Sequence, residues 1–119
     1  MTYVKLVQIT EQLIKYNDET IEMRQERQMD IDREVDFYKE IKPFVNKVDA
    51  ALEEWKGLAL DWIRSEKPKY IHPAQVEQVH ENLQNNALQC FAKRTNEKRF
   101  HETHQAILYT LQSVVNQCI

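Results

Sequence analysis

Glutamate and histidine in the second half of the chain have the spacing closest to a known metal motif. Glu77-Gln-Val-His80 is a Glu-x-x-His sequence, and His101 and His104 follow as a second pair. Di-iron and di-manganese bundles take Glu-x-x-His from each of two helices and a Glu from each of two others. Only one such motif occurs in this half of the chain, and Glu77 lies about 100° around a helix from apolar Val76. We therefore expect no di-metal centre.

The histidines are also poorly placed to share one ion. His80 and His104 each fall near the apolar side of a predicted helix. In an antiparallel pair that turns near residue 95 they lie about 10 Å apart, at about 1.5 Å per residue, whereas zinc needs each nitrogen within about 2.1 Å. His101 and His104 share one side of a helix, but no third ligand is evident beside them. We predict packed histidines and no metal or other cofactor.

Neither cysteine has the surroundings of a catalytic nucleophile. Cys90 and Cys118 lie far apart in the sequence, and neither is followed by a basic cluster or the start of a helix. Gly57, the only glycine, falls inside a predicted helix, so the chain has no glycine-rich loop to hold a phosphate. We predict two free, largely buried thiols and a protein that is not an enzyme.

Polar residues interrupt the apolar side of the first predicted helix. Asn17, Thr20 and Arg24 project toward the interior, and His104 falls at a similar level on the last helix. Buried polar groups cost free energy unless they are paired, so these side chains need partners. One interpretation is a polar layer that fixes the register of the helices. The other is a small polar pocket, with Trp55 in its wall, that binds a ligand.

Long helices are needed to position these residues. With one glycine and three prolines in 119 residues, the chain has few sites for tight turns, which favours an all-α fold. Apolar residues at spacings of three and four predict four helices, at about residues 3–28, 32–65, 73–94 and 97–117.

The second predicted helix carries the strongest apolar stripe, which includes Trp55 and Trp62. We expect it to be the longest helix, with Asp32 as its N-cap. Pro43 lies within it and should cause a kink, because proline removes a backbone donor and clashes with the preceding turn. The alternative is two shorter helices that meet at Pro43.

Short connections between amphipathic helices predict an up-down-up-down antiparallel four-helix bundle, formed by residues 1–119 as a single domain. The 16 basic and 19 acidic side chains give a net charge of -3 and are mixed along the chain. This pattern gives no reason to expect nucleic acid or an anionic membrane as a partner. The N-terminus lacks a basic leader before an apolar run, and no stretch approaches the roughly 20 apolar residues of a membrane span. We expect a cytoplasmic protein.

The segment EKPKYIHPAQ, residues 66–75, forms the predicted corner between the second and third helices. Pro68 disfavours helical geometry at Lys67, so the second helix should end near that residue. Pro73 suits the first turn of the next helix, where its missing N–H has no intrahelical acceptor, and His72 then becomes the N-cap.

Basic and aromatic side chains gather in this corner. Lys67, Lys69, Tyr70 and His72 are candidates for contact with an anion or a partner, because they flank a helix N-terminus, which favours anions. Tyr70 is expected to fold over the end of the bundle. Tyr109 lies opposite the apolar stripe of the last helix and is a candidate anchor for a partner or a second copy, so both a monomer and a homodimer remain open.

Four short stretches carry a family resemblance: FYKEIKPFV at 37–45, EKPKYIHPAQVE at 66–77, KRF at 98–100 and ILYTLQSV at 107–114. Together they resemble the YppE-like proteins of Firmicutes, small bacterial proteins of unknown function. The likeness covers most of the chain from the second helix onward. It implies a compact four-helix bundle, a Firmicutes source and a cytoplasmic setting. It implies no catalytic or ligand-binding residues.

These observations lead us to expect a non-enzymatic accessory or regulatory factor that acts through contacts with an unidentified protein partner. The basis is a set of regular apolar stripes and a mixed surface charge without a catalytic constellation. The alternative is a bundle that binds a small ligand or a metal between its helices.

Overall fold

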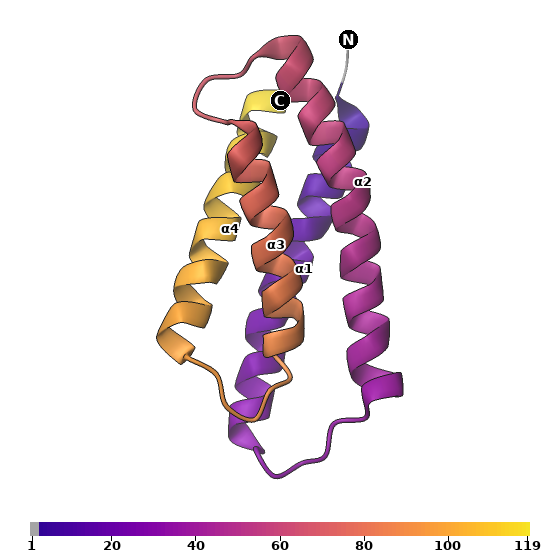
Figure 1. The fold of residues 1–119 in the computed structure, drawn as a ribbon, viewed down its shortest axis with the longest axis vertical. Coiled ribbons are helices and arrows are strands. Elements are labelled where there is room, and N and C mark those ends of the chain that lie inside the picture. The colour runs from indigo at the N-terminus through magenta and orange to yellow at the C-terminus, as the bar shows by residue number, and fades with distance from the viewer. Residues whose placement is uncertain (1–2) are drawn as a thin grey trace.

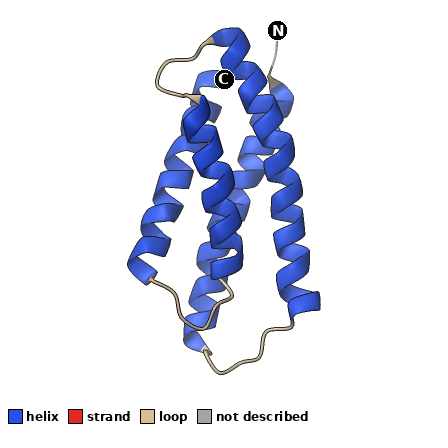
Figure 2. Cartoon of the chain, in the orientation of Figure 1, coloured by secondary structure: helices blue, strands red, loops and turns tan. Residues whose placement is uncertain are grey.

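Four α-helices and one π-helical turn make up the computed structural model, which describes residues 3–119 (Figure 1). The predicted all-α class is confirmed, and Figure 2 shows no strand in the described part of the chain. The elements are α1 (Val4–Met29), η1 (Phe37–Ile41), α2 (Lys42–Glu66), α3 (Pro73–Gln89) and α4 (Glu97–Cys118).

Each helix packs mainly against two others: α1 and α3 both lie against α2 and α4. In Figure 1 the chain descends through α1, returns through α2, descends through α3 and returns through α4, so that the described N-terminal end and the C-terminus share one end of the bundle. The apolar stripes meet along the axis, where Leu13, Trp55, Leu83 and Leu111 are fully buried. Trp62 is also buried, so both tryptophans belong to the core.

The predicted start of the second helix at residue 32, with Asp32 as N-cap, is wrong. Residues 30–36 are irregular, and helical structure begins after Asp36, whose Oδ1 accepts hydrogen bonds from the backbone N–H groups of Tyr38 at 2.9 Å and Lys39 at 3.0 Å. The charged 30–36 segment has no apolar stripe to bury, so packing does not hold it in a helix.

A π-helical turn precedes Pro43. The backbone N–H of Lys42 donates to the carbonyl of Phe37, and α2 follows directly, with Pro43 as its second residue. The 25 residues of α2 are one fewer than the 26 of α1. The second helical segment is therefore the longest only when the five residues of η1 are counted with it.

The corner between α2 and α3 follows the predicted register. The last residue of α2 is Glu66, and Lys67 adopts a left-handed φ of 47° ahead of Pro68, as is common at helix C-termini. His72 is the N-cap of α3, and its backbone N–H donates to Oε1 of Gln75 at 2.6 Å. The predicted end of the third helix at residue 94 is wrong, since α3 stops at Gln89.

Candidate functional site

Asn17 and Thr20 lie in a buried polar layer between α1 and α4. Asn17 is fully buried, and its Nδ2 donates to the backbone carbonyl of His104 at 3.1 Å. The Thr20 hydroxyl donates to the carbonyl of Asn17 at 2.6 Å. Oδ1 of Asn17 has no hydrogen-bond partner among the described residues. The Asn17–His104 contact joins the middle of α1 to α4, which is the arrangement expected of a layer that fixes helix register.

Trp55 does not share a pocket with this layer. Its Nε1 donates to the Thr10 hydroxyl at 3.0 Å, and that hydroxyl donates in turn to the carbonyl of Leu6 at 2.6 Å. All three residues are buried, so Trp55 fills the core and satisfies its one donor there. Sequence periodicity places Thr10 on the inner side of α1 but cannot identify its partner on another helix.

Two of the histidines contact a carboxylate on a neighbouring helix. Nε2 of His104 is 3.1 Å from Oδ1 of Asp18, and Nε2 of His80 is 2.9 Å from Oε1 of Glu53. His101 packs its ring edge-to-face against Phe100. Within residues 3–119, no group of three or more His, Cys, Asp or Glu side chains is placed to hold a metal ion.

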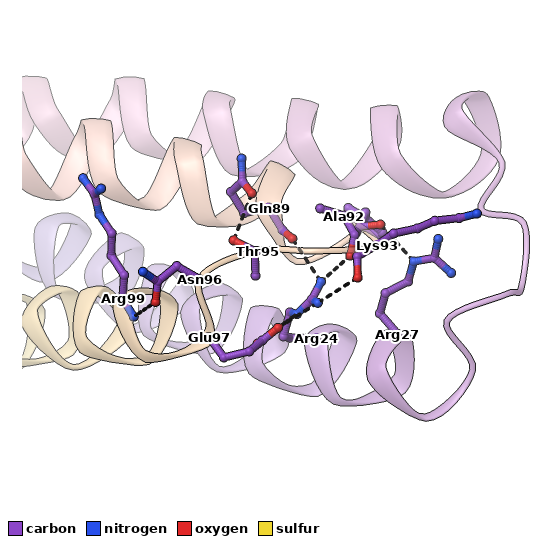
Figure 3. A network of polar contacts seen from close by, with 10 residues as sticks. Arg24, Arg27, Gln89, Ala92, Lys93, Thr95, Asn96, Glu97 and Arg99 are labelled. Atoms are coloured by element: carbon purple, nitrogen blue, oxygen red, sulfur yellow. Dashed lines mark hydrogen bonds and ion pairs between the residues drawn. The ribbon is translucent and has the colours of Figure 1, made fainter.

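Arg24 lies at the centre of the largest polar network, at the end of the bundle where α3 gives way to α4 (Figure 3). Its side chain is only 2% exposed, and it reaches Glu97 at the start of α4 with Nη2 to Oε2 at 2.8 Å. Nη1 also donates to the carbonyls of Gln89, at 3.4 Å, and Ala92, while Nη2 donates to that of Lys93 at 3.4 Å. Arg24 therefore donates to backbone carbonyls at the end of α3 and in the loop after it. Because these carbonyls have a side-chain partner, they need no further turn of helix, which explains why α3 ends earlier than predicted.

Arg27 is a second buried arginine, one turn further along α1, and sequence reasoning missed it. Its Nε donates to the carbonyl of Phe91 at 3.0 Å, and its Nη1 donates to that of Arg33 at 2.6 Å. The two arginines together hold both connections at this end of the bundle. The helical spacing could have predicted that Arg27 is buried, because a residue three positions after an inward-facing Arg24 lies on the same side of the helix.

This network is suited to structure and not to catalysis. The Arg24 guanidinium is enclosed by a carboxylate and backbone carbonyls, so no donor faces a free ligand.

Burial raises the pKa of the Cys90 thiol to about 12, which keeps it protonated at neutral pH. Burial also raises the pKa of Cys118. The structure therefore presents no activated thiol at either position.

The corner candidates are exposed and do not form a cluster of side-chain contacts. Tyr70 is 82% exposed with a left-handed φ of 67°, so the prediction that it folds over the bundle end is wrong. The side chains of Lys67 and Lys69 are exposed and make no ion pair or hydrogen bond with another described residue. The backbone carbonyl of Lys69 accepts a hydrogen bond from Nε2 of Gln117 at 2.8 Å, which ties the corner to α4.

A shallow groove follows the outer seam between α1 and α4, and we call it the α1/α4 groove. Its central section has a volume of about 550 Å³. Ile14 and Val115, both half-buried, supply its apolar residues. The remaining lining residues are polar and mostly acidic: Glu11, Lys15, Asp18, Glu19, Glu22 and Gln112.

The groove continues toward the termini as an apolar hollow of about 480 Å³ that shares Glu11 with the central section. Val4 and Ile119 are both well exposed there. Tyr109, 73% exposed, precedes Gln112 by one turn of α4, so it flanks the central section. Because the groove is made by two helices distant in sequence, periodicity within one helix could not reveal it.

The fold and this polar network define a small, all-helical domain. A family model, the bacterial domain of unknown function DUF1798, matches residues 10–118, and the chain belongs to that family. The predicted resemblance is confirmed by the uncharacterized protein YppE of Bacillus subtilis, which is 32% identical over 112 residues that cover 94% of this chain and 90% of YppE.

Solved structures show the same fold. A protein of unknown function from Listeria innocua is 30% identical and superimposes with a TM-score of 0.92, covering 98% of this chain and 92% of the other. The crystal structure of YppE gives a TM-score of 0.89 at 32% identity, covering 98% and 94% of the two chains. A Staphylococcus aureus member with 23% identity and a TM-score of 0.89, each chain covered in full, shares the fold.

Proposed function

We propose that this protein is a non-enzymatic interaction factor that binds a basic, amphipathic helical segment of a partner protein along the α1/α4 groove. The observation that carries the proposal is the composition of the groove, which joins apolar residues to a row of carboxylates. Amphipathic helices bind such grooves through apolar residues repeated at helical spacing.

The length of the groove suits a helix. From Val4 to Glu22 it follows α1 for about 27 Å, at about 1.5 Å per residue, which matches a partner helix of about five turns. Apolar side chains of the partner would pack near Val4 and Ile119 at one end. Its Lys and Arg side chains would face Asp18 and Glu22 at the other end, where charge complementarity fixes the orientation.

The acidic side chains of the groove are available for such contacts. Glu11 and Glu22 have no ion-pair partner among the described residues, and both are exposed. Among the described residues, Asp18 has one ion-pair partner, His104, at 3.1 Å. Tyr109 flanks the groove as an exposed aromatic residue, the type of side chain that dominates many protein interfaces.

We also propose that the protein is a cytoplasmic monomer whose partner is a different protein and not a second copy of itself. Its two free thiols, Cys90 and Cys118, support a reducing compartment. No helix within residues 3–119 has the length and apolar character needed to cross a bilayer. The acidic end of the groove favours a basic partner over a second copy of the same surface.

Charge reversal in the groove tests this function. In lysate of the source organism, the wild-type protein should retain a partner, and E11K/E22K should lose it. E34K/E81K makes the same change in net charge at exposed positions outside the groove and should retain it. A synthetic peptide of the partner's basic helix should then bind the wild type, more weakly as salt rises. No retained partner, loss with both variants, or a partner segment that is not a basic helix would each overturn the proposal.

A further inference from the structure

The seam between α3 and α4 has a different chemistry from the α1/α4 groove. Four amide side chains lie on one flank of α3 at the helical spacing i, i+3, i+4 and i+7, and the N-cap and three residues of α4 face them at the same spacing. The two sets are Asn82, Asn85, Asn86 and Gln89, and Asn96, Arg99, Phe100 and Thr103. With Thr95 they line a hollow of about 390 Å³, which we call the amide hollow.

Internal hydrogen bonds hold the walls of the amide hollow in place. Nδ2 of buried Asn86 donates to the carbonyl of Phe100 at 3.3 Å, and the Thr95 hydroxyl donates to Oε1 of Gln89 at 3.1 Å. Asn96 caps α4 by accepting from the backbone N–H of Arg99 at 3.0 Å. Because Arg24 also anchors the loop that carries Thr95, the hollow exists before any ligand arrives.

Other polar groups in the hollow have no internal partner. The side chains of Asn82, Asn85 and Thr103 make no hydrogen bond to another described residue, and the Arg99 guanidinium makes neither a hydrogen bond nor an ion pair. Figure 3 shows the Arg99 side chain extending away from the Arg24 network. No acidic side chain lines the hollow, so Arg99 supplies its only charge.

We propose that the amide hollow binds a small hydroxylated carboxylate, such as a sugar acid. The planar guanidinium of Arg99 matches the geometry of one carboxylate and can bind it through two parallel hydrogen bonds. Amide and hydroxyl groups both donate and accept, as ligand hydroxyls do, which assigns the hydroxyl contacts to Asn82, Asn85 and Thr103. The volume falls within the range of small-molecule sites and is too small for a protein helix.

Titration with D-glucuronate, followed by ¹H–¹⁵N NMR, tests this site. We expect saturable shifts confined to residues 82–89 and 95–103. Glucose, which lacks the carboxylate, and acetate, which lacks the hydroxyls, should bind much more weakly. R99Q should weaken binding on the order of tenfold or more, since a hydrogen bond to a charged group is lost. N82A should also weaken it.

Two variants serve as matched controls. R94Q removes an exposed arginine of the same connection that does not line the hollow, and Q78A removes an exposed amide one turn before Asn82. Both should bind glucuronate as the wild type does, and the melting temperatures of R99Q and R94Q should agree. Absence of saturable shifts, shifts outside the hollow, equal binding of acetate, or an unaltered affinity in R99Q would each overturn the assignment. The site is on a different seam, so failure here leaves the α1/α4 groove untouched.

Discussion

Arg24 and Glu97, 73 positions apart in the sequence, form an ion pair in which Nη2 and Oε2 are 2.8 Å apart and the arginine side chain is 2% exposed. The pair joins α1 to the first turn of α4, where a carboxylate also complements the helix dipole. Since the same guanidinium holds the carbonyls of Gln89 and Lys93, one side chain positions the whole α3–α4 connection.

Removing the carboxylate of this pair should destabilise the protein. E97A leaves a buried guanidinium without a counter-charge, and we expect a loss of about 3 kcal/mol in the free energy of unfolding, measured by urea denaturation. E102A, which breaks an exposed i,i+4 contact with Lys98 at 3.9 Å, should change stability by less than about 1 kcal/mol. Equal losses of stability for the two variants would show that the ion pair between Arg24 and Glu97 does not stabilise the protein.

The Trp55–Thr10 hydrogen bond gives a second stability prediction. T10V keeps the shape of the side chain but leaves the buried indole N–H without a partner, which should cost about 1 to 3 kcal/mol by urea denaturation. T110V alters a buried threonine that makes no side-chain hydrogen bond to a described residue and should cost less. In W55F, which lacks the indole N–H, T10V should cost less than it does in the wild type. An effect of T10V no larger than that of T110V would contradict this assignment.

Thiol reactivity should follow burial. With its pKa raised to about 12 by burial, Cys90 is almost entirely protonated near neutral pH and should resist iodoacetamide, while half-buried Cys118 is labelled first. Mass spectrometry of C118S should therefore show slow labelling in the folded state and rapid labelling in urea. Labelling of folded C118S as fast as that of C90S would show that Cys90 is accessible.

Glu40 should make stability depend on acid pH. The backbone N–H of Asp36, at 2.9 Å, and the guanidinium of Arg33 lower the pKa of Glu40 below its ordinary value of 4.5. A carboxyl whose pKa is lowered by folding stabilises the protein above its unfolded pKa, and that stability is lost as pH falls through its folded pKa. The unfolding midpoint of E40Q should thus fall less steeply than that of the wild type between about pH 5 and about pH 3. E34Q serves as the control and should show the same pH dependence as the wild type. If the midpoint of E40Q falls as steeply as that of the wild type, Glu40 does not have this role.

The parts of the fold that could be predicted from sequence are those with local causes. Helical periodicity located the stripes of α1 and α4, and two prolines located the corner around His72. The end of α3 depends on a distant residue, because Arg24 donates to the carbonyls of Gln89 and of Lys93 in the loop that follows. The start of the second helical segment has a local cause, the cap formed by Asp36, but the charged 30–36 segment before it gave no periodic signal.

The candidate sites also have features that follow from helical spacing and features that depend on contacts between helices. Inward placement of Asn17, Thr20 and Arg24 follows from helical spacing alone, and all three are buried. Their partners, the α1/α4 groove and the amide hollow depend on which helices become neighbours. Such contacts have no counterpart in the pattern of a single helix.

Site-specific photo-cross-linking tests the proposed interaction most directly. A benzophenone amino acid replaces one exposed tyrosine at a time: Tyr109 beside the groove, Tyr38 in η1, or Tyr70 at the α2–α3 corner, which are 73%, 75% and 82% exposed. In cells of the source organism, we predict that position 109 captures a protein through a basic helical segment and that positions 38 and 70 do not. Capture of the same partner from position 38 or 70, or no capture from position 109, would contradict binding along the α1/α4 groove.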